Sequence, residues 1–287
     1  MSLIETKDLV YLYGARTPFE VKALDHIDLS LSEGGIKAVI GHTGSGKSTL
    51  IQHFNALLKP AQGEVLFHGK NINESKESAY RIRFRVGLCF QYPEYQLFED
   101  TVYKDIAFGP TNMGLSAQQI DESVRRAASY VGIDEALFEA SPFDLSGGQK
   151  RRIAVAGVMA MDPDVLILDE PTAGLDPSGR EMILDMICSY REKTGKTVII
   201  VSHSMDDVAR IADEVIVVNR GKIALQGSVH EIFSHSEELT AMGLSVPEVT
   251  GITDRLRSMG IPLPTGIYTA EQAADAIAEY LNGRARV

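Results

Sequence analysis

An apolar run followed at once by a glycine-rich segment is the strongest constraint on the fold of this chain. The run GIKAVI leads directly into GHTGSGKSTL at residues 41–50. Gly41, Gly46, Lys47 and Ser48 fit the spacing G-x-x-x-x-G-K-[ST], which predicts a tight loop between a buried strand and a helix. The backbone N–H groups of such a loop, at the positive end of the helix, can surround phosphate oxygens. The segment therefore predicts a strand–loop–helix unit that binds a phosphorylated ligand.

Short β-branched runs alternate with helical patterns over most of the chain, which predicts an α/β fold with a mainly parallel core sheet. The expected core strands are residues 35–40, 86–90, 164–169, 197–202 and 214–219. Residues 63–69 alternate between apolar and polar side chains, so we expect a half-exposed antiparallel strand there, as part of an antiparallel β subdomain. The expected units are a P-loop domain (1–233), a helical subdomain inserted into it (about 92–161) and a small C-terminal α-helical appendage (234–287).

Four polar side chains follow expected core strands. Asp169 and Glu170 end VLILDE, Gln91 follows the strand VGLCF, and His203 follows TVIIVS. Because ligands of parallel sheets bind beyond the carboxyl ends of the strands, we expect these residues to share one site with the glycine loop. A buried Asp169 carboxylate needs a cation, and Mg²⁺ held by the Ser48 hydroxyl would supply it.

Within that site, the expected roles follow from the chemistry of each side chain. Lys47 would place a point charge beside the β- and γ-phosphates of a nucleotide. Glu170 would orient or deprotonate an attacking water. Gln91 would reach the Mg²⁺ or that water, and His203 would donate a hydrogen bond to the γ-phosphate.

Residues 144–152, DLSGGQKRR, begin a helix in an unusual way. Ser146 and Gln149 form a capping-box pattern, but Gly147 and Gly148 between them each cost about 1 kcal/mol against alanine in a helix interior. Three basic residues follow at the positive end of the helix dipole, where acids are preferred. Glycines at a helix N-terminus allow close approach of a phosphate, which the dipole and the nearby basic residues would favour. The glycine loop already serves the chain's own nucleotide, so we expect this second site to face a nucleotide held by a partner.

Composition sets further limits. The 287 residues are 44% hydrophobic and 23% charged, ordinary values for a globular protein that can bury a large core. The net charge of −11 shows no basic footprint of a nucleic-acid binder. Cys89 and Cys188 lie in apolar stretches and are expected to be buried thiols. The N-terminus has no signal-peptide run, and no segment approaches the ~18 apolar residues of a membrane span. We therefore expect a cytosolic protein whose membrane role, if any, comes through a partner.

Taken in order, the glycine loop, Gln91, LSGGQ at residues 145–149, LDEPTAGLD at 168–176 and His203 make residues 1 to about 230 resemble an ABC-type ATPase. The resemblance implies ATP and Mg²⁺ as cofactors and two domains that close head to tail around ATP. It implies that ATP is contacted by Gly41, His42, Thr43, Gly44, Ser45, Gly46, Lys47, Ser48 and Thr49. The implied metal ligands are Ser48, Gln91 and Asp169, and the implied catalytic residues are Glu170, His203, Gln91 and Lys47. The signature segment that faces the partner's ATP would consist of Leu145, Ser146, Gly147, Gly148 and Gln149.

Two further site residues depend on the same resemblance. An aromatic residue near the N-terminus stacks on adenine in this family, and Tyr13 matches it best, with Tyr11 as the rival. The loop that ends at Asp176 resembles the segment that communicates between the two nucleotide sites.

Residues 90–110 and 145–177 resemble the ATPases of energy-coupling factor (ECF) vitamin and metal transporters, in particular the second of two paralogous ATPase subunits. This implies ATP hydrolysis that drives import, at the cytoplasmic face of the cell membrane. The implied partners are a paralogous ATPase or a second copy of this chain, a transmembrane coupling subunit and a substrate-binding membrane component. The appendage would then make ATPase–ATPase contacts.

Several aromatic residues lie among acids between Gln91 and Pro110: Tyr92, Tyr95, Phe98, Tyr103 and Phe108. For most of them we favour a place in the core of the helical subdomain. The resemblance also implies that this region forms the groove that receives helices of a membrane subunit.

Three alternatives use the same ATPase. DNA-repair and chromosome ATPases carry long coiled-coil insertions, which do not fit between Gln91 and Ser146. Ribosome-associated ABC proteins usually carry two cassettes, whereas this chain has one glycine loop of this type. The ATPase of an ordinary ABC transporter differs only in its partner. The sequence leaves open the transported substrate, whether the pair is a homodimer or a heterodimer, and whether both composite sites hydrolyse ATP.

Overall fold

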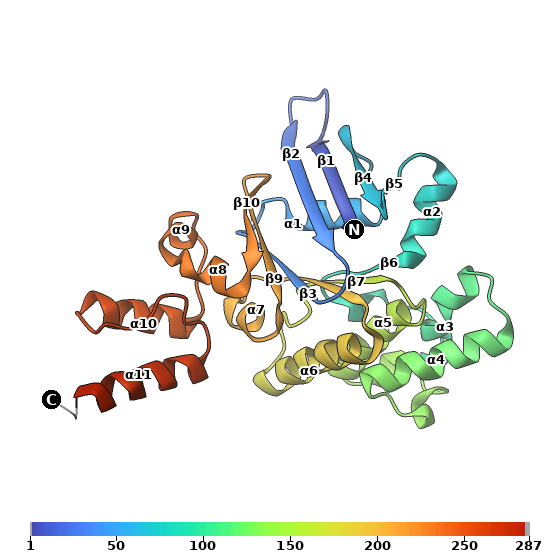
Figure 1. Cartoon of the computed structure of the whole chain (residues 1–287). Coiled ribbons are helices and arrows are strands. Elements are labelled where there is room, and N and C mark those ends of the chain that lie inside the picture. The colour runs from blue at the N-terminus through green and yellow to red at the C-terminus, as the bar shows by residue number, and fades with distance from the viewer. Residues whose placement is uncertain (1, 285–287) are drawn as a thin grey trace.

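Two β-sheets and a surrounding set of helices make up the part of the chain that the computed structural model describes, residues 2–284 (Figure 1). Residues 1 and 285–287, at the outer ends of the two expected units, lie outside it. The six-stranded core sheet has the order β10-β9-β3-β8-β7-β6, and its strands from β9 to β6 are parallel. These strands are β3 (Ile36–Ile40), β6 (Val86–Cys89), β7 (Val165–Asp169), β8 (Thr197–Val201), β9 (Glu214–Asn219) and the antiparallel edge strand β10 (Lys222–Ser228). The mainly parallel core sheet is therefore confirmed.

The second sheet is antiparallel and has the order β2-β1-β4-β5. Its strands are β1 (Ser2–Tyr13), β2 (Val21–Ser32), β4 (Gln62–Phe67) and β5 (Lys70–Asn71). The prediction that residues 63–69 are antiparallel is correct, but the prediction of a half-exposed strand is wrong. Val65, Leu66 and Phe67 are all buried, because both faces of this end of β4 are covered.

Helices cover the core sheet, and three of them form a helical subdomain at one side of it. Before residue 229 the described helices are α1 (Lys47–Phe54), α2 (Lys76–Arg85), the 3₁₀ turn η1 (Pro93–Gln96), α3 (Val102–Asn112), α4 (Ala117–Val131), the short turns η2 (Glu135–Leu137) and η3 (Pro142–Asp144), α5 (Gly147–Met159), α6 (Pro177–Thr194) and α7 (Met205–Ile211). The helices α3, α4 and α5 pack on one another, as expected of a helical insertion, at the lower right of Figure 1.

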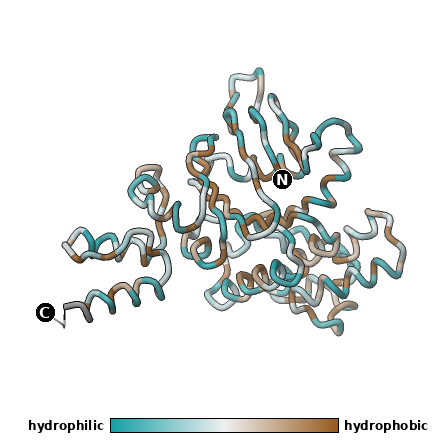
Figure 2. The backbone as a smooth tube through the Cα atoms, in the orientation of Figure 1, coloured by the Kyte–Doolittle hydropathy of each residue, from teal (hydrophilic) through white to brown (hydrophobic). Residues whose placement is uncertain are grey.

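The apolar core divides along the core sheet. On β3, Ala38 and Ile40 pack into the cluster that contains the helices α3 to α6, whereas Val39 packs into the cluster beneath the antiparallel sheet and α1. Alternate side chains of a strand point to opposite faces, so one short buried strand holds both layers together. Figure 2 shows strongly hydrophobic residues along these central strands. Burial on both faces explains the uninterrupted apolar runs of the sequence.

The C-terminal helices lie to one side of the core, at the left of Figure 1. They are α8 (Val229–Ser234), α9 (Ser236–Ala241), α10 (Glu248–Ser258) and α11 (Ala270–Arg284). Leu263, Ile267 and Ala273 form a small apolar cluster separate from the main core. The backbone N–H of Glu248 donates to Asp206 of α7 at 3.1 Å, which ties the appendage to the core. Within residues 2–284, no helix combines the length and the apolar character that crossing a membrane requires.

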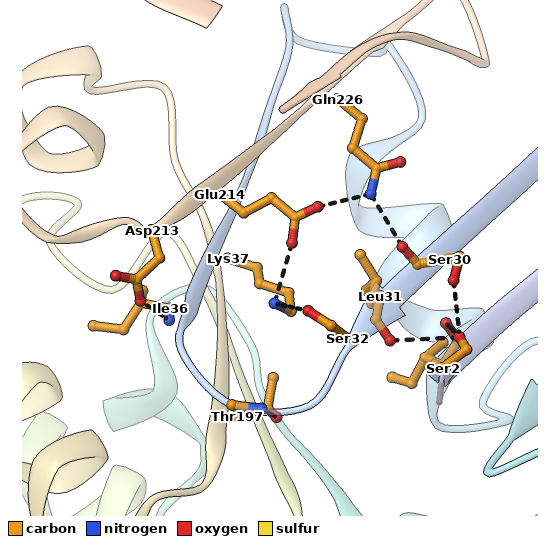
Figure 3. Close-up of polar contacts among 12 residues, drawn as sticks. Ser2, Ser30, Leu31, Ser32, Ile36, Lys37, Thr197, Asp213, Glu214 and Gln226 are labelled. Atoms are coloured by element: carbon orange, nitrogen blue, oxygen red, sulfur yellow. Dashed lines mark hydrogen bonds and ion pairs between the residues drawn. The ribbon is translucent and has the colours of Figure 1, made fainter. Parts of the chain in front are cut away.

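A polar cluster around one buried lysine joins the two sheets near the amino end of β3 (Figure 3). Lys37 is buried, and its Nζ lies 3.1 Å from both Glu214 Oε2 and Ser32 Oγ. Gln226 Nε2 donates to Glu214 Oε1 at 2.8 Å and to the Ser30 carbonyl at 3.0 Å. One lysine on the core sheet therefore anchors the end of β2 and the start of β9.

Candidate functional site

The strand order brings the predicted site residues to one edge of the core sheet. The glycine loop follows β3, His203 comes shortly after β8, Asp169 ends β7, and Gln91 lies two residues beyond β6. The strands β3, β8, β7 and β6 are neighbours and parallel, so all their carboxyl ends meet at this edge. The strand order therefore places the glycine loop, Gln91, Asp169 and His203 at the same edge of the sheet, as the sequence predicted.

The glycines of the loop occupy positions that other residues would not fit. Gly41 has φ 156°, and a Cβ there would lie 2.2 Å from the Val218 carbonyl oxygen. Gly46 has φ 110°, and a Cβ there would lie 2.7 Å from the Ala23 carbonyl oxygen. Gly44, by contrast, faces open space. The loop is thus packed against β9 and β2 on one side and open on the other, as close approach of a phosphate requires.

Lys47 lies buried within the loop, where its Nζ donates to the carbonyls of Gly41 at 2.7 Å and His42 at 3.1 Å. Burial lowers the pKa of its ammonium, while the carboxylates of Glu170 and Asp169 oppose that shift. Burial likewise raises the pKa of Asp169, and a side-chain hydrogen bond from Ser48 and the charge of Lys47 counteract it. Both groups are thus desolvated, and each favours the charged form of the other.

Glu170 and His203 form a direct pair beside this space. Glu170 Oε2 lies 2.7 Å from His203 Nδ1; the carboxylate is largely buried, whereas 72% of the histidine side chain is exposed. Glu170 has φ 51°, in the left-handed region, which costs a side-chain-bearing residue roughly 1–2 kcal/mol. Its N–H donates to the Val201 carbonyl at 2.9 Å, so β8 helps to hold this conformation. Gln91 is exposed at the same edge.

The donor set fits Mg²⁺. Asp169, Ser48 and Gln91 offer a carboxylate, a hydroxyl and an amide oxygen, which are hard oxygen ligands. No group of three His, Cys, Asp or Glu side chains that could hold a metal occurs among the described residues. A site of this kind therefore suits an ion bound by one carboxylate, a hydroxyl and the phosphates of its nucleotide, as Mg²⁺ usually is.

The two rival tyrosines differ in their surroundings. Tyr11 packs on the apolar cluster under the antiparallel sheet and makes an edge contact with His53, with ring centroids 4.8 Å apart. Tyr13 is 43% exposed, and its hydroxyl lies 3.2 Å from Thr49 Oγ1 on α1. The two rings meet edge-on with centroids 4.9 Å apart, and both contact α1, but Tyr13 is the more exposed of the two, which favours it as the residue that stacks on a base.

The signature segment forms the capping box that its sequence predicts. The Ser146 hydroxyl accepts from the Gln149 N–H at 3.3 Å, and Gln149 Oε1 accepts from the Ser146 N–H at 3.0 Å. A Cβ on Gly147 or Gly148 would meet no atom within 4 Å, so this helix end is open on its glycine side. Leu145, in contrast, packs against the main core. The open N-terminus of α5 can accept an anion supplied from outside the chain.

The three basic residues after the signature make hydrogen bonds within the fold, and Arg151 is buried, so it does not offer the exposed charge that the sequence suggested. Lys150 Nζ donates to the Phe143 carbonyl at 2.8 Å, and Arg152 donates to the carbonyls of Val131 and Gly132. Arg151 is buried and contacts Glu94 and the chain after Glu170. Carbonyl and carboxylate acceptors within the fold outweigh the unfavourable helix dipole at this position.

Asp176 is the N-cap of α6, and its Oδ1 accepts from the Gly179 N–H at 2.8 Å.

A hydrogen-bond network centred on buried Asp207 was not predicted from the sequence. Thr172 Oγ1 donates to Asp207 Oδ2 at 2.8 Å, and Arg180 Nε donates to Asp207 Oδ1 at 2.5 Å. Ser204, next to His203, accepts a hydrogen bond from Arg180. The only sequence signal was the Ser-x-x-Asp spacing of Ser204 and Asp207 at the start of α7.

Comparison with known proteins gives a consistent result. A model of the ABC transporter family matches residues 24–173. The chain is 50% identical over 284 residues to the energy-coupling factor transporter ATP-binding protein EcfA2 of Caldanaerobacter subterraneus subsp. tengcongensis, covering 99% of each chain. It is 51% identical over 279 residues to the protein of the same name from Clostridium perfringens, covering 97% of this chain and 98% of the relative.

Solved structures agree with this. The fold is similar to cbiO1 from Clostridium perfringens, part of the ABC transporter complex cbiONQ, with a TM-score of 0.75, 38% identity and coverage of 88% of this chain and 99% of that one. It is also similar to a dimeric ATP-binding cassette in a post-hydrolysis state with ADP and Pi, with a TM-score of 0.70, 25% identity and coverage of 78% and 98%.

Proposed function

This chain belongs to the ABC transporter family, as an ATP-binding protein of the energy-coupling factor type, and we propose that it is the ATP-hydrolysing motor of an importer for a vitamin or a metal ion. The observation that carries the proposal is the convergence of the glycine loop, Asp169, Glu170 and His203 at one edge of the core sheet. The chain would work at the cytoplasmic face of the membrane as a peripheral subunit.

Each residue of the edge has a task in hydrolysis. Lys47 and the loop N–H groups would bind the β- and γ-phosphates, and Ser48, Asp169 and Gln91 would hold Mg²⁺. That ion, when bound, neutralises charge on the β- and γ-phosphate oxygens. Glu170 accepts a proton from the attacking water, and His203 orients Glu170 and the γ-phosphate. The protein contributes mainly positioning and charge stabilisation, because the phosphoryl transition state spreads its charge over several oxygens.

The open N-terminus of α5 completes a site on a second ATPase. Ser146, Gly147 and Gly148 offer backbone and hydroxyl groups to an external phosphate, whereas the chain's own nucleotide would be bound by the glycine loop that leads into α1. Two domains would therefore close head to tail, with Asp176 between the two nucleotide sites. We assign the pairing partner to a paralogous ATPase or a second copy, and ATPase–ATPase contacts to the appendage that follows residue 233.

A groove on the helical side fits a membrane subunit. The groove, of about 310 Å³, lies between α2, α3, α5 and η1. Phe98 and Phe108, both exposed, make an edge contact on its wall with ring centroids 4.8 Å apart. Asp105 lines it too; this side chain is buried, and its Oδ2 has no hydrogen-bond partner among the described residues. The groove therefore suits a helix of the transmembrane subunit that carries apolar residues and one basic side chain.

The test is reconstitution. The chain should copurify with a paralogous ATPase and membrane subunits when it is expressed with the genes that neighbour its own, and the complex should hydrolyse ATP with Mg²⁺. Phe108→Glu should release the chain from the membrane subunits, while Phe143→Glu, an equally exposed aromatic outside the groove, should not. Membrane association that survives Phe108→Glu and Asp105→Arg would contradict the docking site, and hydrolysis stimulated by DNA would contradict the transport function.

A further inference from the structure

One arginine of the signature helix touches the two loops on which the proposed chemistry depends. Arg151 lies in α5, five residues after Ser146, and only 3% of its side chain is exposed. Its guanidinium donates through Nε to Glu94 Oε2 at 3.0 Å and through a terminal nitrogen to Glu94 Oε1 at 2.8 Å. The other terminal nitrogen donates to the carbonyl of Pro171 at 3.2 Å and to that of Ala173 at 2.8 Å. Three segments distant in sequence are thus joined at one planar group.

Each of these segments carries or adjoins a proposed site residue. Glu94 lies in η1, three residues after Gln91. Pro171 directly follows Glu170, and the Ala173 N–H donates to the Glu170 carbonyl at 3.1 Å. Arg151 therefore binds the turn that begins at Glu170 at two carbonyls. The contact between Arg151 and the Glu94 carboxylate is bidentate, a geometry for which a guanidinium is better suited than an ammonium.

The turn needs such a restraint. Glu170 has φ 51°, a conformation that residues with a side chain rarely adopt and that persists only where the surroundings enforce it. The bond from its N–H to Val201 fixes the start of the turn, and Arg151 fixes the carbonyls beyond it. The direction of the Glu170 carboxylate depends on this backbone conformation.

We propose that Arg151 is a positioning residue for hydrolysis: it holds the Glu170 turn in its strained conformation and locks that turn to η1 through Glu94. The proposal rests on the proposed ATPase function but adds a buried residue that is not among the proposed ATP or Mg²⁺ contacts. Because Gln96 of η1 and Ile153 of α5 also line the groove, Arg151 links two elements of the groove wall to the Glu170 turn.

The neighbouring arginine provides a matched control. Arg152 is on the same helix and also donates to two carbonyls, those of Val131 and Gly132, but these lie at the end of α4 and not beside a proposed site residue. Both Arg151→Met and Arg152→Met remove a guanidinium that binds backbone carbonyls. Only Arg151→Met removes support from the Glu170 turn.

The experiment measures steady-state ATP hydrolysis and ATP binding by the assembled complex, well below its unfolding temperature. Misplacement of a catalytic group by about 1 Å can cost on the order of a hundredfold in rate. Arg151→Met should therefore lower kcat at least tenfold with KM and ATP affinity changed less than threefold, and Arg152→Met should keep kcat within about twofold. Arg151→Lys and Glu94→Gln, which keep part of the contact, should lie between Arg151→Met and wild type and serve if Arg151→Met does not fold.

Hydrogen exchange of the peptide that covers residues 170–174 gives a second readout that does not require hydrolysis. Arg151→Met should speed exchange in this peptide at least tenfold, and Arg152→Met should not. A kcat within twofold of wild type in Arg151→Met, or unchanged exchange in this peptide, would overturn the proposal. Equal losses of kcat in the two methionine variants would also overturn it, since they would indicate a purely structural effect. If wild-type complex hydrolyses no ATP, the proposed function fails, while the exchange data still decide the role of Arg151.

Discussion

Glu170 Oε2 and His203 Nδ1 lie 2.7 Å apart, which joins the ends of two adjacent core strands by one side-chain contact. A neutral imidazole has a single N–H. If Nδ1–H donates to Glu170, the other ring nitrogen has no proton for a phosphate. Donation to a γ-phosphate therefore requires either a protonated ring or release of Glu170. The contact makes Glu170 orientation and γ-phosphate recognition interdependent.

The first prediction concerns Glu170→Gln. The amide keeps the size and one acceptor oxygen but cannot accept a proton from water, and loss of a general base typically costs 10²–10⁴-fold in rate. We expect ATP affinity within about threefold of wild type, nearly abolished turnover and an ATP-bound closed dimer that is stable to gel filtration. Near wild-type phosphate release by this variant would exclude Glu170 as the base.

Lys47→Ala tests the phosphate loop. The lysine is buried and already donates two hydrogen bonds to loop carbonyls, so its charge is held where the phosphates would bind. A hydrogen bond to a charged group contributes roughly 1.5–3 kcal/mol, which is about a ten- to hundredfold change in Kd. Titration with a fluorescent ATP analogue should show at least a tenfold loss of affinity. An unchanged affinity would contradict the assignment of this loop to ATP.

Much of this site could be predicted from the sequence because its signals are local. The spacing of Gly41, Gly46 and Lys47 reflects backbone geometry, and the polar residues at strand ends follow from burial on both faces of the core sheet. Gly41 also has a non-local reason, because a Cβ there would lie 2.2 Å from the Val218 carbonyl oxygen of β9 as well as 2.6 Å from Ser45 Oγ of its own loop.

Features that depend on distant partners could not be predicted. An antiparallel β subdomain was expected, but its strands β1 and β2 were not located; register shifts interrupt their pairing, and Asp8 in β1 and His26 in β2 have φ of 51° and 52°. From its place after the signature, Arg151 was expected to favour an anion. Its actual acceptors include two backbone carbonyls, which carry no sequence signature and so could not be predicted. Glu94, 57 residues away, became its partner only through the tertiary fold.

Lys37→Met tests the polar cluster of Figure 3 as a structural link without a role in ATP binding. The side chain is 4% exposed and pairs with Glu214 at 3.1 Å. Removing one partner of a buried pair typically costs about 3–5 kcal/mol, so thermal unfolding should shift downward by on the order of 10 °C. ATP affinity should not change, because the cluster lies near the amino end of β3 and the phosphate loop follows its carboxyl end.

Glu214→Gln in the same background provides the control for Lys37→Met. It removes the unpaired charge while an amide can still bond Gln226, and should recover part of the lost stability. A double variant no more stable than Lys37→Met would show that the ion pair is not the source of the effect.

Stability should fall below about pH 6.5 because of His53. This side chain is buried on α1, and burial lowers the pKa of its imidazole below the ordinary 6.5, although the hydrogen bond with the Thr49 carbonyl opposes the shift. The unfolded chain then takes up a proton near pH 6.5 while the folded chain resists it. The stabilisation is complete above that pH and is lost as the pH falls toward the folded-state pKa, by at most about 1.4 kcal/mol per pH unit.

Urea unfolding between pH 7.5 and 5.5 measures this dependence. His53→Gln should flatten it relative to wild type, whatever its effect at pH 7.5, and His68→Gln, at an exposed histidine, should leave the slope as it is. Equal slopes in wild type and His53→Gln would show that another group controls the acid sensitivity.

Two of the capping boxes among the described residues provide a final test of the composite site. Ser116 and Gln119 begin α4 with the same reciprocal hydrogen bonds as Ser146 and Gln149 at α5, but without glycines between them. Loss of either cap should cost about 1 kcal/mol of stability. Ser146→Arg should also block approach of the partner's ATP at the open glycine face, so the assembled complex should bind ATP but hydrolyse at least a hundredfold more slowly. Ser116→Arg should hydrolyse ATP at close to the wild-type rate. Because the two substitutions remove equivalent caps, equal hydrolysis by both variants would exclude Ser146 from any composite site.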